Sequence, residues 1–239
     1  MSKLLIFNWK MNPATLKEAV SLAKTSDYEN VVVAPPFPFL EEAGKVLKKA
    51  KLGAQDLFYE EKGAFTGEVS AKELKDLCVE YVIIGHSERR HKLGETDEMI
   101  AKKLKAALDE GLIPVLCVGE TKKEKEDGER KKVIERQLEI GLSLIPKRST
   151  LSAGRFIIAY EPVWAIGTGN PETPDSAVET IKLIKSLVVS RWSSVKVLYG
   201  GSVNSQNLGD YLKYEEIDGA LVGGASLDKE EVKAMVGLI

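Results

Sequence analysis

Five polar or ionisable side chains follow short apolar segments and could together carry out acid–base chemistry: Asn8 and Lys10, His86 and Glu88, and Glu161. A carboxylate can take a proton from carbon, a histidine can exchange protons with oxygen, and a lysine can supply a fixed positive charge. Singly, each has a more ordinary explanation, as a solvated lysine, a hydrogen-bonded structural histidine or a glutamate paired with a neighbouring arginine. Because all five occupy corresponding positions, we interpret them as one catalytic set.

A second group of residues could bind an anion. The glycine pairs Gly200-Gly201 and Gly223-Gly224 each follow an apolar segment, Gly167 lies beyond Glu161, and Ser202 adds an N–H group and a hydroxyl. Glycines allow backbone N–H groups to approach a ligand closely and to form an anion-binding nest. One such pair is more often a tight turn, but two pairs at corresponding positions favour a phosphate site.

Eight short apolar segments recur along the chain and predict strands that are buried on both faces, since most are rich in β-branched residues. The third has little β propensity and is included only because of its spacing. The eight segments are Leu4–Phe7, Val31–Ala34, Leu52–Ala54, Tyr81–Ile84, Ile113–Val118, Phe156–Tyr160, Val195–Tyr199 and Ala220–Val222.

Segments with helical periodicity lie between these strands. Thr96, Thr173 and Asp228 can cap the starts of three helices, and Glu231 would complete a capping box with Asp228. Helix follows strand to both ends without a linker or a break in composition, so we predict an α/β fold, a single closed (β/α)8 barrel domain over residues 1–239. A doubly wound open sheet is the alternative. In a barrel, the residues that follow the strands converge on one face, which would bring the catalytic set and the glycine pairs together.

Composition excludes several classes of protein. Of the 239 residues 44% are apolar, which suffices for a large core. The 34 Lys and Arg residues against 36 Asp and Glu residues give a net charge of −2, which disfavours nucleic-acid binding. The apolar runs are too short for a membrane span or a signal peptide. Cys78 and Cys117 lie in apolar sequence surroundings without metal-ligand spacing, which predicts reduced thiols and a cytoplasmic location. We interpret the mixed-charge segment Lys122–Lys132 as a solvated loop and helix start.

Seven short motifs stand at or near the predicted strand ends. In sequence and order they are similar to those of the triosephosphate isomerase family, which the chain resembles over essentially its whole length, and the resemblance implies the (β/α)8 TIM barrel of that family. The motifs are Asn8–Asn12, Val32–Pro36, Gly63–Glu68, Ile83–Arg90, Ala159–Gly169, Tyr199–Val203 and Val222–Ser226.

The resemblance implies that the protein interconverts dihydroxyacetone phosphate and D-glyceraldehyde 3-phosphate through an enediolate, with no cofactor and no metal. It implies that Glu161 is the carbon base and His86 the electrophile, since a carboxylate base beside a neutral histidine is the arrangement described for this family. It also places Lys10 and Asn8 at the substrate oxygens and adds Glu88, whose role is less defined. The residues expected to bind substrate are Asn8, Lys10, Gly167, Ser202, Gly223 and Gly224.

The segment that follows Glu161 predicts a lid, because it combines a rigid proline, an apolar middle and a Gly-Thr-Gly end. Such a lid would exclude water and protect an enediolate phosphate from eliminating its phosphate. The residues of the lid are Pro162, Val163, Trp164, Ala165, Ile166, Gly167, Thr168 and Gly169. Beyond it, Asn170 stands where the family often has lysine.

The loop Gly63–Glu68 predicts a homodimer, because Phe65 at its centre would otherwise leave apolar surface in water. The resemblance places this loop, with Phe65, Thr66 and Gly67, against the partner subunit.

Two other functions remain as alternatives. One is another phosphate-binding TIM-barrel enzyme, such as a sugar-phosphate isomerase or an aldolase; an aldolase would need a lysine for a Schiff base, for which Lys10 between two asparagines is a poor candidate. The other is an inactive metabolite-binding barrel, which would not need both Glu161 and His86. We interpret Cys117 as a packing residue, because no base lies beside it in sequence to activate it.

Overall fold

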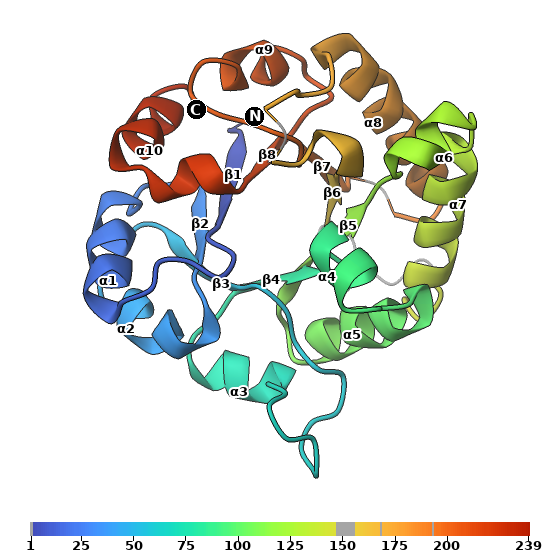
Figure 1. Cartoon of the computed structure of the whole chain (residues 1–239). Coiled ribbons are helices and arrows are strands. Elements are labelled where there is room, and N and C mark those ends of the chain that lie inside the picture. The colour runs from blue at the N-terminus through green and yellow to red at the C-terminus, as the bar shows by residue number, and fades with distance from the viewer. Residues whose placement is uncertain (1, 147–155, 168, 193) are drawn as a thin grey trace.

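Eight parallel strands form a closed barrel in chain order in the computed structural model, which describes residues 2–146, 156–167, 169–192 and 194–239. β1 pairs with both β2 and β8, so the predicted (β/α)8 barrel is confirmed and the open sheet is wrong. Figure 1 looks along the barrel, with the helices in a ring around the strands. The strands are β1 (Leu4–Asn8), β2 (Val31–Ala34), β3 (Lys51–Ala54), β4 (Tyr81–Ile84), β5 (Ile113–Val118), β6 (Ile157–Tyr160), β7 (Lys196–Tyr199) and β8 (Gly219–Val222).

β3 forms despite its low β propensity because the neighbouring strand β2 packs closely against it and leaves no room for a side chain at Gly53. It pairs with β2 through Leu52 and with β4 through Ala54. A Cβ atom at Gly53 would lie 2.7 Å from a methyl group of Val32, closer than packed carbon atoms approach. Close packing against β2, and not strand propensity, therefore explains the glycine at position 53.

The described helices alternate with the strands as expected. Thr96, Thr173 and Asp228 each accept backbone N–H bonds at a helix start, as predicted. The capping box at the last helix is wrong, because the Glu231 carboxylate accepts two hydrogen bonds from Ser205 instead. The helices are α1 (Leu16–Thr25), η1 (Phe37–Phe39), α2 (Leu40–Gly44), α3 (Ala71–Asp76), α4 (Ser87–Lys92), α5 (Asp97–Asp109), α6 (Lys122–Glu126), α7 (Arg130–Gly141), η2 (Val163–Ala165), α8 (Pro174–Val189), α9 (Leu208–Leu212), η3 (Gly224–Leu227) and α10 (Lys229–Val236).

Two apolar clusters make up the core. Alternate strand residues such as Leu4 and Ile6 fill the barrel interior, while Leu5 and Phe7 pack outward against the helices. The strands are thus buried on both faces, as their composition predicts. None of the described helices combines the length and the apolar character needed to cross a bilayer.

The two cysteines are both free but differ in their surroundings. Cys117 lies in the barrel interior, where burial raises the pKa of its thiol. Cys78 is exposed in a left-handed conformation just beyond α3, so its predicted apolar surroundings are wrong. The turn that ends α3 brings it to the surface, although apolar residues flank it in sequence.

Three buried charged side chains, Asp56, Glu95 and Lys103, lie in one cluster beyond the end of β3 with the half-buried Arg89. The Lys103 ammonium donates to both Asp56 carboxylate oxygens at 2.8 and 2.7 Å and also bonds Glu95, while Arg89 Nη2 lies 2.9 Å from Asp56 Oδ2. Burial raises the pKa of Asp56 from 3.8 to about 6, with the two cations opposing this rise and the Glu95 charge adding to it. The Asp56 carboxylate is therefore costly to ionise in the folded protein.

We compare the free energy of unfolding of the wild type with that of Asp56→Asn. The wild-type value minus the variant value is expected to fall by about 2 kcal/mol between pH 4 and pH 6.5. An acid with a raised pKa in the folded state is more protonated there than in the unfolded chain, so stability is lost as the pH rises from 3.8 to about 6. Urea unfolding of both proteins, at the same protein concentration and at each pH, measures the difference. A difference that does not change with pH would contradict the prediction.

Candidate active site

Polar residues from several strand ends gather around one cavity of about 320 Å³. The cavity is lined by residues at the ends of β1, β4 and β6 and by the loops that follow β6, β7 and β8. Its lining includes all but one of the proposed catalytic and substrate-binding residues: Asn8, Lys10, His86, Glu161, Gly167, Ser202, Gly223 and Gly224. The exception is Glu88, which reaches the site through its contacts with Lys10 and His86.

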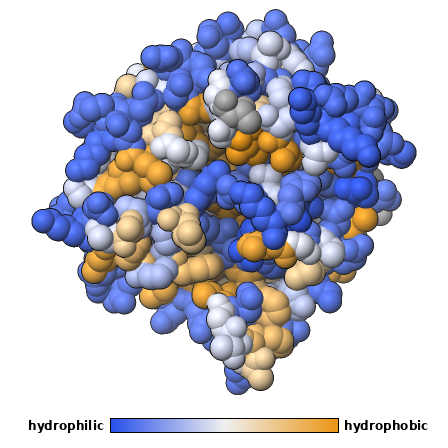
Figure 2. Space-filling model, in the orientation of Figure 1, coloured by the Kyte–Doolittle hydropathy of each residue, from blue (hydrophilic) through white to orange (hydrophobic). Residues whose placement is uncertain are grey.

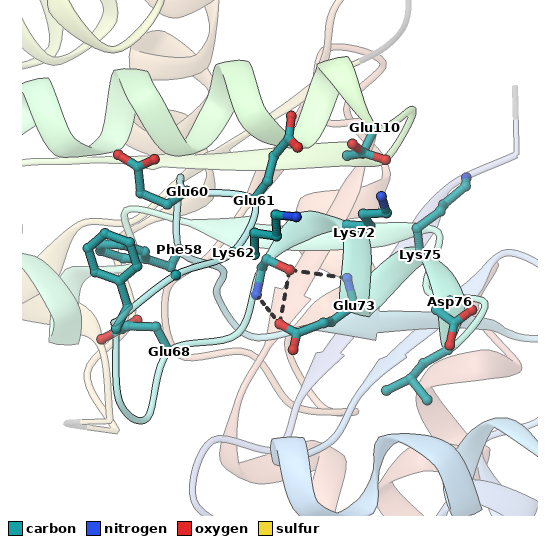
Figure 3. A pocket seen from close by; sticks show the side chains of 14 residues that line it. Phe58, Glu60, Glu61, Lys62, Glu68, Lys72, Glu73, Lys75, Asp76 and Glu110 are labelled. Atoms are coloured by element: carbon teal, nitrogen blue, oxygen red, sulfur yellow. Dashed lines mark hydrogen bonds between the residues drawn. The ribbon is translucent and has the colours of Figure 1, made fainter.

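A larger hollow of about 1070 Å³ lies between the β3–α3 loop and α3, away from these strand ends. Its lysine and glutamate side chains point in different directions and do not converge on a common point (Figure 3). The hydrogen bonds drawn there join Ser70 and Glu73, the capping box of α3. The smaller cavity is therefore the candidate active site.

The Glu161 carboxylate is buried and held between two donors. Its Oε1 lies 3.1 Å from His86 Nε2, and its Oε2 accepts the Ser87 N–H at 2.9 Å. His86 caps α4, where its Nδ1 accepts the Glu88 N–H at 3.2 Å, so we assign the imidazole proton to Nε2. In the described part of the chain Glu161 does not pair with the arginines near it in sequence, because Arg90 pairs with Asp97 and Arg89 with Asp56 and Glu95.

Each member of this pair stabilises the charged form of the other. Burial lowers the pKa of His86, but the charge of Glu161 and the hydrogen bond to it outweigh burial and raise that pKa overall. Burial would raise the pKa of Glu161, but His86, the Ser87 N–H and the Lys10 charge together lower it. The carboxylate is therefore ionised in the resting site, as a general base must be.

Lys10 adopts an uncommon backbone conformation that is held by its neighbours. Its φ of 54° lies in the left-handed region, which costs a non-glycine residue about 1 kcal/mol or more. The Gln55 amide donates to the Lys10 carbonyl at 2.8 Å, and the Lys10 N–H donates to Asn8 Oδ1 at 3.0 Å. The Lys10 ammonium lies 3.0 Å from Glu88 Oε1, so Glu88 and Gln55 both fix the position of this cation. Gln55 gave no signal in the sequence.

The glycines allow close packing around the carboxylate and the cation. A Cβ atom at Gly200 would lie 2.9 Å from Glu161 Cγ, and one at Gly223 would lie 3.3 Å from Lys10 Cε. The Ser202 hydroxyl donates to the Ala165 carbonyl at 2.6 Å, so in this structure it binds the predicted lid and only its N–H group is left for an anion.

The predicted lid packs against the segment that follows β5, in addition to its contact with Ser202. The Trp164 indole N–H donates to Glu120 Oε1 at 3.0 Å, and the Lys125 ammonium lies 3.3 Å from the centre of the Trp164 ring. Ala165 is buried, while Ile166, Gly167 and Gly169 line the cavity; Thr168 lies outside the described residues. Lys125 is exposed, as the interpretation of Lys122–Lys132 as a solvated segment expects, although it also contacts Trp164; the interpretation is wrong for Arg130, which is half-buried and bonds Glu120.

Comparison with known proteins gives a consistent result over nearly the whole chain. The sequence model of a family described as triosephosphate isomerase matches residues 3–239. The chain is 46% identical to the triosephosphate isomerase of Aquifex aeolicus, with 99% of each chain covered. It is 45% identical to that of Dictyoglomus thermophilum, with 94% of each covered, and 46% identical to that of Endomicrobium trichonymphae, with 98% and 97% covered.

Proposed function

This chain belongs to the triosephosphate isomerase family, and from that premise we propose that the cavity at the strand ends binds the triose phosphate and that Glu161, His86 and Lys10 carry out the isomerisation. The protein is an aldose–ketose isomerase that interconverts dihydroxyacetone phosphate and D-glyceraldehyde 3-phosphate. The observation that carries the assignment of roles is the buried Glu161–His86 pair, with its 3.1 Å contact in the same cavity as the Lys10 ammonium.

Glu161 is the base that moves a proton between the two substrate carbons. It takes the proton from one carbon, the electron pair forms the enediolate, and Glu161 returns the proton to the adjacent carbon. To reach carbon, its carboxylate must leave His86 Nε2 and the Ser87 N–H. Burial then dominates, so the pKa of Glu161 rises and it becomes a stronger base just when it meets the C–H bond.

His86 moves protons between the two substrate oxygens. Once Glu161 leaves, the imidazole loses its anionic partner, and burial favours the neutral form. A neutral imidazole with its proton on Nε2 can donate to an enediolate oxygen and accept a proton back. Its Nδ1 stays bound to the Glu88 N–H, which keeps the ring in place.

Lys10 and the glycine loops compensate the negative charge of the substrate. The Lys10 ammonium, held by Glu88, supplies positive charge to the enediolate and the phosphate, and Asn8 lies beside it. We assign the phosphate to the backbone N–H groups of Gly167, Ser202, Gly223 and Gly224. Support comes from the short distance between the Gly223 position and Lys10, which brings cation and nest together.

Residues 162–169 act as a lid over this site. The contacts of Trp164 with Glu120 and of Ala165 with Ser202 support this role, because each joins the segment to a different loop of the barrel. With the lid docked, water has less access to the enediolate, and the electrostatic interactions in the cavity become stronger.

A coupled assay with D-glyceraldehyde 3-phosphate tests the activity directly. Turnover of purified protein without added metal or cofactor is the expected result. Binding of a phosphate-bearing analogue without turnover would point instead to a metabolite-binding barrel. We place the protein in the cytoplasm as one barrel domain, which is supported by its two free thiols and by the family match over residues 3–239.

We further propose that the chain forms a homodimer through the loop between β3 and α3. This loop projects from the barrel (Figure 1), and pale and orange surface covers part of it (Figure 2). Phe65 is 42% exposed and Met11, next to Lys10, is 92% exposed. The exposed Phe65 on this loop and the exposed Met11 beside Lys10 support an interface that buries both side chains and also holds the Lys10 loop in place.

Sedimentation equilibrium at micromolar concentration is expected to give twice the chain mass of 26.2 kDa. Phe65→Asp should shift the protein towards the monomer and lower its activity, because a charge at this position opposes burial and the Lys10 loop loses its support. Lys62→Glu, a charge change in the same projecting loop, serves as the control. A fully active monomer in the wild-type protein would contradict both the interface and its supporting role.

A further inference from the structure

Two buried carboxylates beneath the lid share one guanidinium. Glu120 and Glu172 are 0% and 2% exposed. Arg130 donates from Nε to Glu120 Oε1 at 3.0 Å and from Nη2 to Glu172 Oε1 at 2.6 Å. We name Glu120, Arg130, Tyr160 and Glu172 the hinge cluster. None of its members is used by the isomerisation chemistry described above.

The hydroxyl of Tyr160 lies between the two carboxylates. It is 2.9 Å from Glu172 Oε2 and 3.2 and 3.3 Å from the two oxygens of Glu120. Burial, and then the charges of both glutamates, raises the pKa of Tyr160, so the phenol keeps its proton. One hydroxyl proton serves one carboxylate at a time, and the shorter distance favours Glu172.

The hinge cluster contacts the start of the lid and lies close to its end in sequence. Glu120 accepts the Trp164 indole N–H at 3.0 Å, near the start of the lid. Glu172 lies three residues beyond the last lid residue, Gly169, and its backbone is held by two tyrosines: its N–H donates to the Tyr199 hydroxyl, and its carbonyl accepts from Tyr211. A change at Glu172 can therefore reach Trp164 through Tyr160 and Glu120.

We propose that Glu172 is a positioning residue that holds the Tyr160 proton away from Glu120, so that among the described side chains Glu120 keeps only Arg130 as a donor until Trp164 docks on it. This inference rests on the proposed role of residues 162–169 as a lid. A buried carboxylate that is held by one donor alone is costly, and a second donor from Trp164 lowers that cost and so favours the docked lid. Without the Glu172 carboxylate, Tyr160 turns to Glu120, only 3.2 Å away, and docking of Trp164 adds less.

Glu172→Gln tests the proposal with little change of volume. The amide oxygen can still accept from Arg130, but the amide NH₂ then faces the Tyr160 oxygen and directs the hydroxyl proton to Glu120. We expect kcat/KM to fall about tenfold, which is the size of one charge-assisted hydrogen bond, and the share of methylglyoxal to rise. Fluorine NMR of protein labelled with 5-fluorotryptophan should show a changed Trp164 signal, with Trp9 and Trp192 in the core unaffected.

Removal of the competing hydroxyl should reverse the effect. Tyr160→Phe in the Glu172→Gln background leaves Glu120 dependent on Trp164 again, so the Trp164 signal and most of the lost kcat/KM should return. A merely weakened hinge would not be rescued by loss of a second hydrogen bond. Glu179→Gln, the same change of charge at an exposed position of α8, is the matched control and should match wild type.

Two results would overturn the proposal: a Glu172→Gln variant with the wild-type Trp164 signal and product ratio, or a defect that persists in full in the double variant. Wild-type turnover in the same assay separates these from a failure of the proposed function. An active wild type with an unaffected Glu172→Gln variant removes only the role of Glu172, whereas an inactive wild type removes the isomerase mechanism itself.

Discussion

Glu161→Gln is expected to lower kcat by about 100- to 10,000-fold, the range over which a general base contributes to catalysis. The amide keeps the shape of the side chain and can still accept the Ser87 N–H, but it cannot take a proton from carbon. Binding of a phosphate-bearing enediolate analogue should stay largely intact, because Lys10 and the glycine loops are unchanged. Steady-state kinetics and calorimetric titration of the analogue measure the two quantities.

The exposed Glu179→Gln variant serves as the control for this substitution as well. It removes one carboxylate from the surface of α8 and should keep wild-type kcat. Near-full turnover of the Glu161 variant would remove Glu161 from the role of base, whatever its distance from His86. Loss of analogue binding together with loss of turnover would instead indicate that Glu161 mainly shapes the site.

Deletion of Ala165–Thr168 is expected to lower isomerisation on the order of 100-fold and to divert the enediolate to methylglyoxal. The deletion removes the Ala165 carbonyl that accepts from Ser202 and the Gly167 N–H assigned to the phosphate. Water then reaches the intermediate, and loss of phosphate competes with return of the proton. The barrel itself should persist, since connecting segments tolerate length changes better than strands do.

Product analysis separates the two effects of the deletion. The ratio of methylglyoxal to isomerised product should rise steeply, while circular dichroism and the oligomeric mass stay as in wild type. A shortened protein that isomerises normally and forms no methylglyoxal would show that residues 162–169 are only a surface connection.

The positions of the strands, several helix starts and the polar residues that line the candidate site were predictable from the sequence, because each depends on local patterns. Short β-branched runs such as Val31–Ala34 can be buried on both faces only in a covered parallel sheet. The hydroxyls of Thr96 and Thr173 cap their helices through neighbours only three residues away. Even β3, which propensity did not indicate, could be placed from the spacing of its neighbours. The closed barrel then brings its strand ends to one face, where Lys10, His86 and Glu161 meet.

Pairings between distant loops were decided by the tertiary structure alone. Glu88 holds Lys10 across 78 residues of sequence, and Arg130 reaches Glu172 across 42. A charged residue in a sequence does not identify its partner, because the partner depends on which loops the closed barrel brings together. Burial then determines how much free energy each contact contributes, since the low dielectric between packed loops strengthens the attraction within an ion pair and raises the cost of an unpaired charge. The mixed-charge segment Lys122–Lys132 illustrates this: its composition is that of a solvated surface, yet the barrel places part of it against the lid, where it helps to hold Trp164.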